Sequence, residues 1–305
     1  MDIRALLMGL AFAFMWSSAF TSARMIVADA PPMLALSLRF LISGLIGIAI
    51  ARALGQSWHL TPAQWRATFI FGLSQNALYL GLNFIAMQTI EASLAAIIAS
   101  TMPLLVALAS WLVLGERLRP LAVGGLFAGF AGVAIIMGAR LSGGVDLFGL
   151  LLCVAGVVAL TVATLSVRGA SASGGNLLMI VGLQMLVGSA ILIGPALAFE
   201  SFEVNWTWRL AGAFSYTVLV PGLAATWVWF LLVARIGAVR AATYHFLNPF
   251  FGVAVAAFLL SEALGLFDLL GVVVIMAGIL AVQRSRVVMR DAGQTPPVPD
   301  PIPPR

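Results

Sequence analysis

The sequence predicts an all-α integral membrane protein whose ten transmembrane helices form two inverted five-helix repeats. Hydrophobic residues make up 62% of the 305 residues and charged residues only 9%, which leaves too little polar surface to cover a water-soluble globule. Apolar runs of about 20 residues, the length that crosses a bilayer, can be marked ten times. The landmarks of the first half also recur in the second half at a constant spacing.

The ten runs are joined by short connections, which leave no room for a soluble domain. A break near residues 171–176 divides them five and five. We expect a first repeat over residues 1–140, a second over residues 141–286, and a proline-rich, disordered cytoplasmic tail over residues 287–305. The runs lie at about residues 5–23, 33–53, 67–88, 92–114, 121–138, 147–167, 176–198, 210–234, 239–261 and 266–283.

The duplication is clearest in spans 4 and 5 and in spans 9 and 10. Pro103 recurs as Pro249, and Glu116 recurs as Glu262, in both cases 146 positions later. Each copy has a helix with a central proline, an acidic corner and a glycine-rich helix. Because five is an odd number of spans, the second copy lies upside down relative to the first. Secondary transporters follow this plan and hold their substrate between the two halves.

The charges indicate the orientation in the membrane. All basic residues other than histidine are arginines, and with the N-terminus inside, twelve of them fall on the inner side and only Arg24, Arg140 and Arg209 on the outer side. We expect a multi-pass protein of the inner (plasma) membrane with both termini in the cytoplasm and no nucleic-acid partner. The first span has Arg4 before it, as a signal peptide would, but its apolar run is too long for a signal core, so we expect it to be retained.

The motifs that follow the two prolines resemble those of a known family. Leu114-Gly115-Glu116-Arg117 after the Pro103 helix, and Leu260-Ser261-Glu262 after the Pro249 helix, are similar to the EamA-type drug/metabolite transporter superfamily, and most of all to its amino-acid exporters. The resemblance covers all ten spans. It implies a central cavity lined by spans 1, 3, 4, 6, 8 and 9. Export as the direction of transport and amino acids as the substrate rest on this resemblance alone.

The prolines point to the same cavity on physical grounds. Pro103 and Pro249 fall near the middle of spans 4 and 9, where each frees the carbonyl four residues earlier, that of Ala99 and that of His245. Irregular backbone at that depth is tolerated inside the protein or against a cavity. Paired breaks in the two halves are typical of a transporter's binding site. The alternative is that both prolines only kink their helices for packing.

Polar side chains inside two spans are candidates for substrate contacts. Gln75, Asn76, Tyr79 and Asn83 share one face of span 3, and Tyr244, His245 and Asn248 precede Pro249 in span 9. The alternative is interhelical hydrogen bonding, worth on the order of 1 kcal/mol per contact; for single asparagines of span 3 the two alternatives stay open. The expected substrate-binding residues are Trp16, Tyr79, Asn83, Ser100, Trp227, Tyr244, His245 and Asn248, with Pro103 and Pro249 as the kinks.

The remaining residues inside the spans give weaker indications. Trp227 and Trp229 point to different faces of span 8, so at most one of them lines the cavity. Arg39, in span 2, is expected to anchor the structure by reaching the surface or pairing with a carboxylate or helix end. Glu116 and Glu262 are expected to cap the following helix or to pair with arginine. Aromatic walls with few polar atoms suit a small amphipathic solute, whereas a phosphorylated solute would require arginines in the cavity.

We therefore predict a secondary transporter that exports amino acids and related small amphipathic metabolites by alternating access. An exporter of drugs, nucleobases or other metabolites is the alternative. Among other classes, an intramembrane protease would carry Gly-x-Ser-x-Gly or paired intramembrane aspartates, and a channel would carry a charged ring; the sequence has none of these. The expected partners are the solute and the lipid bilayer, with no cofactor or metal, in a monomer or weak homodimer.

The distribution of acidic residues predicts how transport is driven. None of the eleven acids lies near the middle of a span, where ion-coupled transporters place a carboxylate. His245 is the titratable side chain at that depth. We predict a facilitator that runs down the gradient of its solute, with His245 as a hydrogen-bonding group. Carbonyls freed by the prolines leave cation binding open as the alternative.

Overall fold

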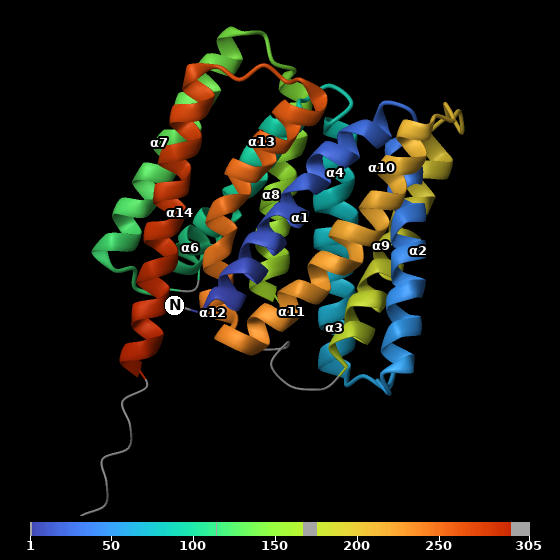
Figure 1. The fold of residues 1–305 in the computed structure, drawn as a ribbon, viewed down its shortest axis with the longest axis horizontal. Helices are drawn as coiled ribbons and strands as arrows, with labels where there is room; N and C mark the ends of the chain where they lie inside the picture. Colours follow the sequence, from blue (N-terminus) through green and yellow to red (C-terminus); the bar gives the residue numbers. More distant parts are fainter. Residues whose placement is uncertain (1, 114, 167–175, 294–305) are drawn as a thin grey trace, which may run out of the picture.

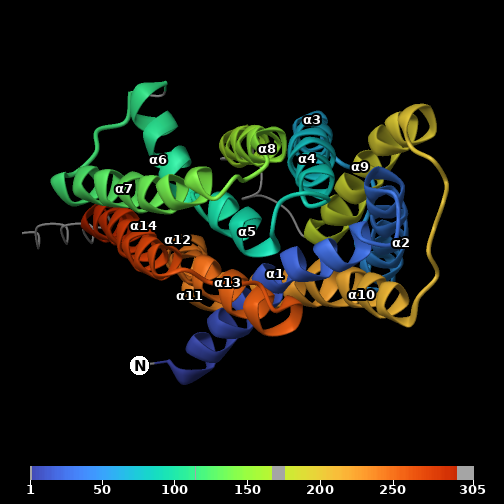
Figure 2. The ribbon, with the colours of Figure 1, turned by 90° about the horizontal axis from the view of Figure 1, so that it is seen from above.

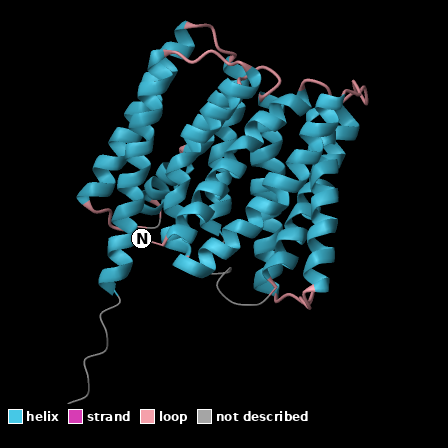
Figure 3. Ribbon diagram, viewed as in Figure 1, coloured by secondary structure: helices cyan, strands magenta, loops and turns pink. Residues whose placement is uncertain are grey.

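The computed structural model describes residues 2–113, 115–166 and 176–293. Every regular element in these ranges is helical, as Figure 3 shows. Within the described part of the chain, ten helical stretches are long and apolar enough to cross a membrane, as the sequence predicts. Their bounds are Ile3–Val27, Pro32–Ala53, Pro62–Ala86, Ala92–Leu112, Pro120–Ser142, Leu147–Ser166, Leu177–Phe199, Trp208–Ile236, Arg240–Leu260 and Leu266–Ser285.

Spans 3, 4, 8 and 9 are each assembled from two or three shorter segments (Figure 1). The first repeat consists of α1 (Ile3–Val27), α2 (Pro32–Ala53), α3 (Pro62–Phe71), η1 (Gly72–Leu80), α4 (Gly81–Ala86), α5 (Ala92–Ser100), α6 (Met102–Leu112) and α7 (Pro120–Ser142). The second consists of α8 (Leu147–Ser166), α9 (Leu177–Phe199), α10 (Trp208–Leu219), η2 (Val220–Ala224), α11 (Ala225–Ile236), α12 (Ala238–Ala242), η3 (Thr243–Leu247), α13 (Asn248–Leu260) and α14 (Leu266–Gly293).

The expected start of the tail differs from the structure, and the expected break between the repeats lies almost entirely outside the described residues. The tail was expected to begin at residue 287, but α14 continues to Gly293. The remainder of that tail lies outside the described residues, as does nearly all of the break expected at residues 171–176. We call the membrane face at which α1 begins and α14 ends the terminal face, and the other the opposite face (Figure 1).

Helix packing repeats the same contacts in both halves. Helix α2 packs along α9 and α7 along α14, and Figure 2 shows these two pairs at opposite ends of the molecule. Between them, α1 contacts α10, α11 and α13, whereas its counterpart α8 contacts η1, α4 and α6. The two central helices, α5 and α13, contact each other. This correspondence is the pseudo-twofold arrangement of two inverted repeats.

Glycines bring α7 and α14 close together. A Cβ atom on Gly125 would lie 2.7 Å from the carbonyl oxygen of Gly278, and one on Gly132 would lie 2.8 Å from the carbonyl oxygen of Gly271. Small residues of this kind let two helix backbones approach within the membrane. These glycines therefore serve packing inside the monomer.

Carboxylates connect the two repeats at the opposite face. Glu262, at the corner after α13, accepts hydrogen bonds from the backbone N–H groups of Ala92 (2.8 Å) and Ser93 (2.9 Å) at the start of α5. Glu262 thus caps a helix of the other repeat, whereas we had expected it to cap the helix that follows it or to pair with arginine. Beside it, Arg140 of α7 pairs with Glu91 at 2.6 Å and with Asp268 of α14 at 3.0 Å.

Candidate substrate-binding site

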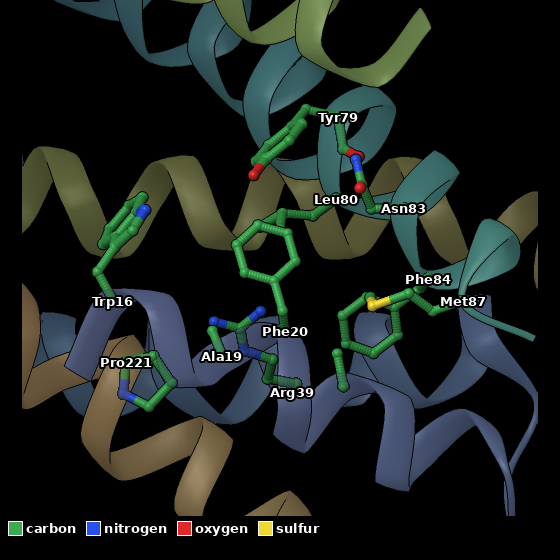
Figure 4. A pocket seen from close by; sticks show the side chains of 11 residues that line it. Trp16, Ala19, Phe20, Arg39, Tyr79, Leu80, Asn83, Phe84, Met87 and Pro221 are labelled. Atoms are coloured by element: carbon green, nitrogen blue, oxygen red, sulfur yellow. The ribbon is translucent and has the colours of Figure 1, made fainter. Parts of the chain in front are cut away.

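A cavity lies between the repeats, on the opposite-face side of the middle of α1 (Figure 4). About 470 Å³ of space in it is not occupied by atoms, including the part that opens to the surroundings. Helices α1, α2 and α4 and the segment η1 contribute its walls from the first repeat, and η2 contributes from the second. The lining residues are Trp16, Ala19, Phe20, Ala23, Arg39, Tyr79, Leu80, Asn83, Phe84, Met87 and Pro221.

Two π-helical segments border this cavity. Segment η1 (Gly72–Leu80) carries Tyr79 and Leu80, and η2 (Val220–Ala224) carries Pro221. The second segment overlaps the first when residue numbers are shifted by the 146 positions of the repeat. Single π turns inside α-helices are rare and are frequent at functional sites. The two irregular segments therefore mark corresponding places in spans 3 and 8.

Three of the expected site residues line the cavity: Trp16, Tyr79 and Asn83. The amide nitrogen of Asn83 donates to the carbonyl oxygen of Tyr79 at 2.8 Å, while its amide oxygen Oδ1 is buried with no partner in the described part of the chain. Asn76 instead donates to the backbone oxygen of Gln184 at 2.8 Å, so it joins η1 to α9. The packing alternative thus holds for Asn76, whereas Asn83 retains an acceptor without a partner.

The three polar residues of span 9 lie apart from the cavity, nearer the terminal face. The ring of His245 stacks on Trp229 with centroids 5.2 Å apart and also contacts Phe12 at 5.3 Å. Phe12 in turn contacts Trp16 at 5.7 Å, so these rings form the floor beneath the cavity. We call Phe12, Trp229 and His245 the aromatic floor. In this structure span 9 contributes no side chain to the cavity that span 3 lines, and substrate contact by Tyr244, His245 and Asn248 stays a prediction.

Tyr244 and Asn248, beside His245, are partly buried. Asn248 has an unpartnered Oδ1, and His245 an unpartnered Nδ1, among the residues described. The ring of Tyr244 covers Gly9 of α1, because a Cβ at Gly9 would lie 2.2 Å from it. Tyr244 therefore packs against the terminal-face end of α1. The Oδ1 atom of Asn248 and the Nδ1 atom of His245 are free to form hydrogen bonds on the terminal-face side of the cavity.

Two further expected residues are placed elsewhere. Trp227 is 47% exposed and does not line the cavity; the inward-facing tryptophan of span 8 is Trp229, because the two lie about 200° apart around the helix. The hydroxyl of Ser100 donates to the carbonyl oxygen of Ala96 at 2.6 Å and is likewise outside the cavity. Neither Trp227 nor Ser100 lines this cavity, and their contact with substrate stays a prediction.

Both prolines occur where their helices break. Pro103 lies at the start of α6, directly after the turn at Thr101, and Pro249 lies at the start of α13, after the 3₁₀ segment η3. The N–H of Thr101 is directed to the carbonyl oxygens of Ile98 and Ala99, and the carbonyl oxygen of His245 accepts the N–H of Asn248. The breaks are confirmed, and cation binding by these carbonyls stays the alternative, because each oxygen has two lone pairs.

Arg39 enters the cavity from α2, which our expectation of a structural anchor missed. Its side chain is only 6% exposed, so it does not reach the surface. Its Nε is buried without a hydrogen-bond partner, and no described residue pairs with its guanidinium group, although the ring of Phe40 lies 5.1 Å from the guanidinium carbon. In Figure 4 the guanidinium group and the hydroxyl of Tyr79 approach the cavity from opposite sides.

Comparison with known proteins decides the family. The model of the EamA-like transporter family matches residues 3–138 and again residues 147–284. The chain belongs to the EamA-like transporter family. The double match also supports the two-repeat architecture.

Relatives of this EamA-like transporter include three curated proteins. An uncharacterized transporter, YvbV of Bacillus subtilis, is 30% identical over 280 residues, or 91% of each chain. The aromatic amino acid exporter YddG of Ancylobacter novellus is 32% identical over 139 residues, covering 46% of this chain and 48% of that protein. Protein PecM of Dickeya dadantii is 24% identical over 280 residues, or 89% of each chain.

A solved crystal structure supports the fold of the EamA-like transporter. It is 22% identical in sequence, has a TM-score of 0.68 and covers 97% of this chain and 100% of its own. At this identity the likeness concerns the fold alone.

Sequence reasoning missed several cavity residues of the EamA-like transporter. Phe20, Phe84 and Met87 carry no distinguishing signal, because apolar side chains are equally expected against lipid. Pro221 did carry a signal: a proline inside span 8 predicts a local break. Arg39 carried the strongest one, because an arginine inside a span faces the protein interior or water.

Proposed function

We propose that the protein exports amino acids and related small amphipathic metabolites across the inner membrane by alternating access. The observation that carries this proposal is the cavity between the repeats, which has aromatic and apolar walls and a few polar groups. Such a lining fits a solute with an apolar body and a polar end. The name of the partial relative YddG supports aromatic amino acids as the class.

Alternating access gives a role to the aromatic floor. The floor contacts Trp16 on the terminal-face side of the cavity, while Glu262 and Arg140 join the repeats at the opposite face. Rocking of one repeat against the other would open and close these two contacts in turn around the solute. With both termini in the cytoplasm, as the arginine distribution favours, the terminal face is the inner face.

The lining of the cavity argues for binding over catalysis. Its eleven residues include no serine, cysteine, histidine or acid that would serve as a nucleophile or general base. Drugs and nucleobases are the competing substrate classes. The panel of solutes described below distinguishes them from amino acids.

Uptake by purified protein in liposomes tests the proposal. A panel of labelled solutes should include leucine, phenylalanine, a quaternary ammonium drug and a nucleobase, and we expect saturable uptake of the amino acids. Replacing Ala19, which lines the cavity, by phenylalanine should block this uptake by filling the site. Ala11→Phe is the matched control, because Ala11 is exposed on the same helix. Uptake of only the drug or the nucleobase would contradict the proposed substrate class.

A further inference from the structure

The buried charge of Arg39 lacks a counterion within the described protein. Only 6% of the side chain is exposed, and neither an ion pair nor a hydrogen bond to a described residue satisfies its five N–H donors. Burial of an unpaired charge costs several kcal/mol, and contact with the Phe40 ring offsets only a small part of this. A charged side chain whose burial costs this much free energy is typical of a functional site inside the membrane.

The acids on the same side of the membrane are engaged elsewhere. Both carboxylate oxygens of Glu200 accept backbone N–H groups at the start of α2, from Met33 at 2.7 Å and Leu34 at 2.8 Å. Asp29 accepts hydrogen bonds from Asn205 and Thr207. The remaining described acids of that face bind Arg140, Thr89 or the start of α5, or are exposed: Glu91, Asp268, Asp146, Glu262 and Glu203. An anion for Arg39 must therefore come from outside the described protein.

The rest of the cavity indicates which anion fits. Phe20, Leu80, Phe84 and Met87 provide an apolar wall that suits an aliphatic or aromatic body. The free Oδ1 of Asn83 is an acceptor for an ammonium or amide N–H group. A planar guanidinium group binds a carboxylate through two parallel hydrogen bonds.

We propose that Arg39 binds the carboxylate of the transported solute, so that the cavity selects apolar amino acids and other apolar monocarboxylates over cationic or neutral compounds. This inference rests on the proposed transport function and specifies its substrate class. The unneutralised guanidinium repels a cationic drug, and an amide analogue, which lacks the carboxylate, loses its main polar contact. A zwitterionic amino acid satisfies both the guanidinium and Asn83.

Matched solute pairs test the inference. Wild-type protein in liposomes should transport L-phenylalanine and 3-phenylpropionate but not L-phenylalaninamide. Arg39→Gln should weaken the apparent affinity for both acids by about tenfold to a hundredfold, the effect expected when hydrogen bonds to a charged group are lost. Arg39→Lys keeps the charge without the planar, forked guanidinium group. Its apparent affinity for both acids should therefore lie between those of the wild type and Arg39→Gln. Arg209→Gln is the control, because Arg209 is 52% exposed at the same face.

Melting temperature separates binding from a structural role. Because Arg39→Gln removes an unpaired buried charge, its melting temperature in detergent should equal or exceed that of the wild type. L-Phenylalanine should raise the melting temperature of the wild type and not that of Arg39→Gln. A large fall in melting temperature or loss of folding in Arg39→Gln would overturn the inference in favour of structural anchoring.

The solute pattern separates failure of this inference from failure of the proposed function. Transport of phenylalanine and its amide at equal rates, or an unchanged preference in Arg39→Gln, would overturn the role of Arg39 and leave amino-acid transport intact. Transport of 3-phenylpropionate alone, dependent on Arg39, would support the role of Arg39 and reject amino acids as substrates. Transport of neither acid would reject both.

Discussion

At the scale of residues, the corner after each proline helix turns through a left-handed backbone conformation. In the first repeat this residue is Gly115, with φ of 67°, and in the second it is Ser261, with φ of 55°. The two positions correspond under the 146-residue repeat. Glycine adopts this conformation freely, whereas a residue with a Cβ is strained by roughly 1–2 kcal/mol. The serine therefore costs stability at the corner that places Glu262.

This strain predicts opposite effects of two substitutions. Ser261→Gly should raise the free energy of unfolding by about 1 kcal/mol, and Gly115→Ala should lower it by about as much. A Cβ at Gly115 would meet nothing within 4 Å, so backbone strain alone is tested there. Melting curves of purified protein in one detergent measure both changes. A lower melting temperature for Ser261→Gly would show that its hydroxyl contributes more than the strain costs.

Apart from Trp16, the cavity residues were predictable only where polarity marks the inward face of a span. Tyr79 and Asn83 interrupt an apolar helix, and both line the cavity. Trp227 and Trp229 could not be told apart, because lipid and protein interior are both apolar and the pattern of hydrophobic residues does not distinguish them. The cavity role of Arg39 was missed because a sequence does not show whether a partner carboxylate is within reach.

At the scale of elements, the close contact of α7 and α14 gives a further prediction. Gly125→Val should lower the melting temperature by several degrees, because its side chain would push against the backbone of Gly278. Gly124→Val is the matched control on the next position of α7, where a Cβ has nothing within 4 Å. Thermal unfolding in detergent compares the two variants. Equal melting temperatures would contradict glycine-mediated packing of these helices.

The length and number of the spans were predictable because a bilayer fixes how many apolar residues a helix needs. The proline breaks followed from a missing donor and a steric clash. The π segment η1 had no such cause in its sequence, because it contains no proline. It contacts α8 and α9, and a single sequence does not reveal such contacts.

At the scale of the whole molecule, the arrangement of charges bears on how transport is driven. No acid is among the described residues that line the cavity, and the described acids at the opposite face bind cations, hydroxyls or helix ends, or are exposed. Coupling to protons would require a group in the path that changes charge. His245 lies partly buried in the aromatic floor, and its buried Nδ1 has no partner among the described contacts. We therefore predict a facilitator in which His245 acts as a hydrogen-bonding group.

Counterflow tests most directly whether two repeats carry a solute between them without an ion gradient. Liposomes containing the protein are loaded with unlabelled L-phenylalanine and diluted into labelled L-phenylalanine at matched pH and matched sodium. Label should accumulate transiently above its external concentration, because a carrier returns across the membrane faster with solute bound, and His245→Gln should still show it. Uptake that appears only under an imposed proton gradient, and loses that dependence in His245→Gln, would contradict the facilitator and make His245 the coupling residue.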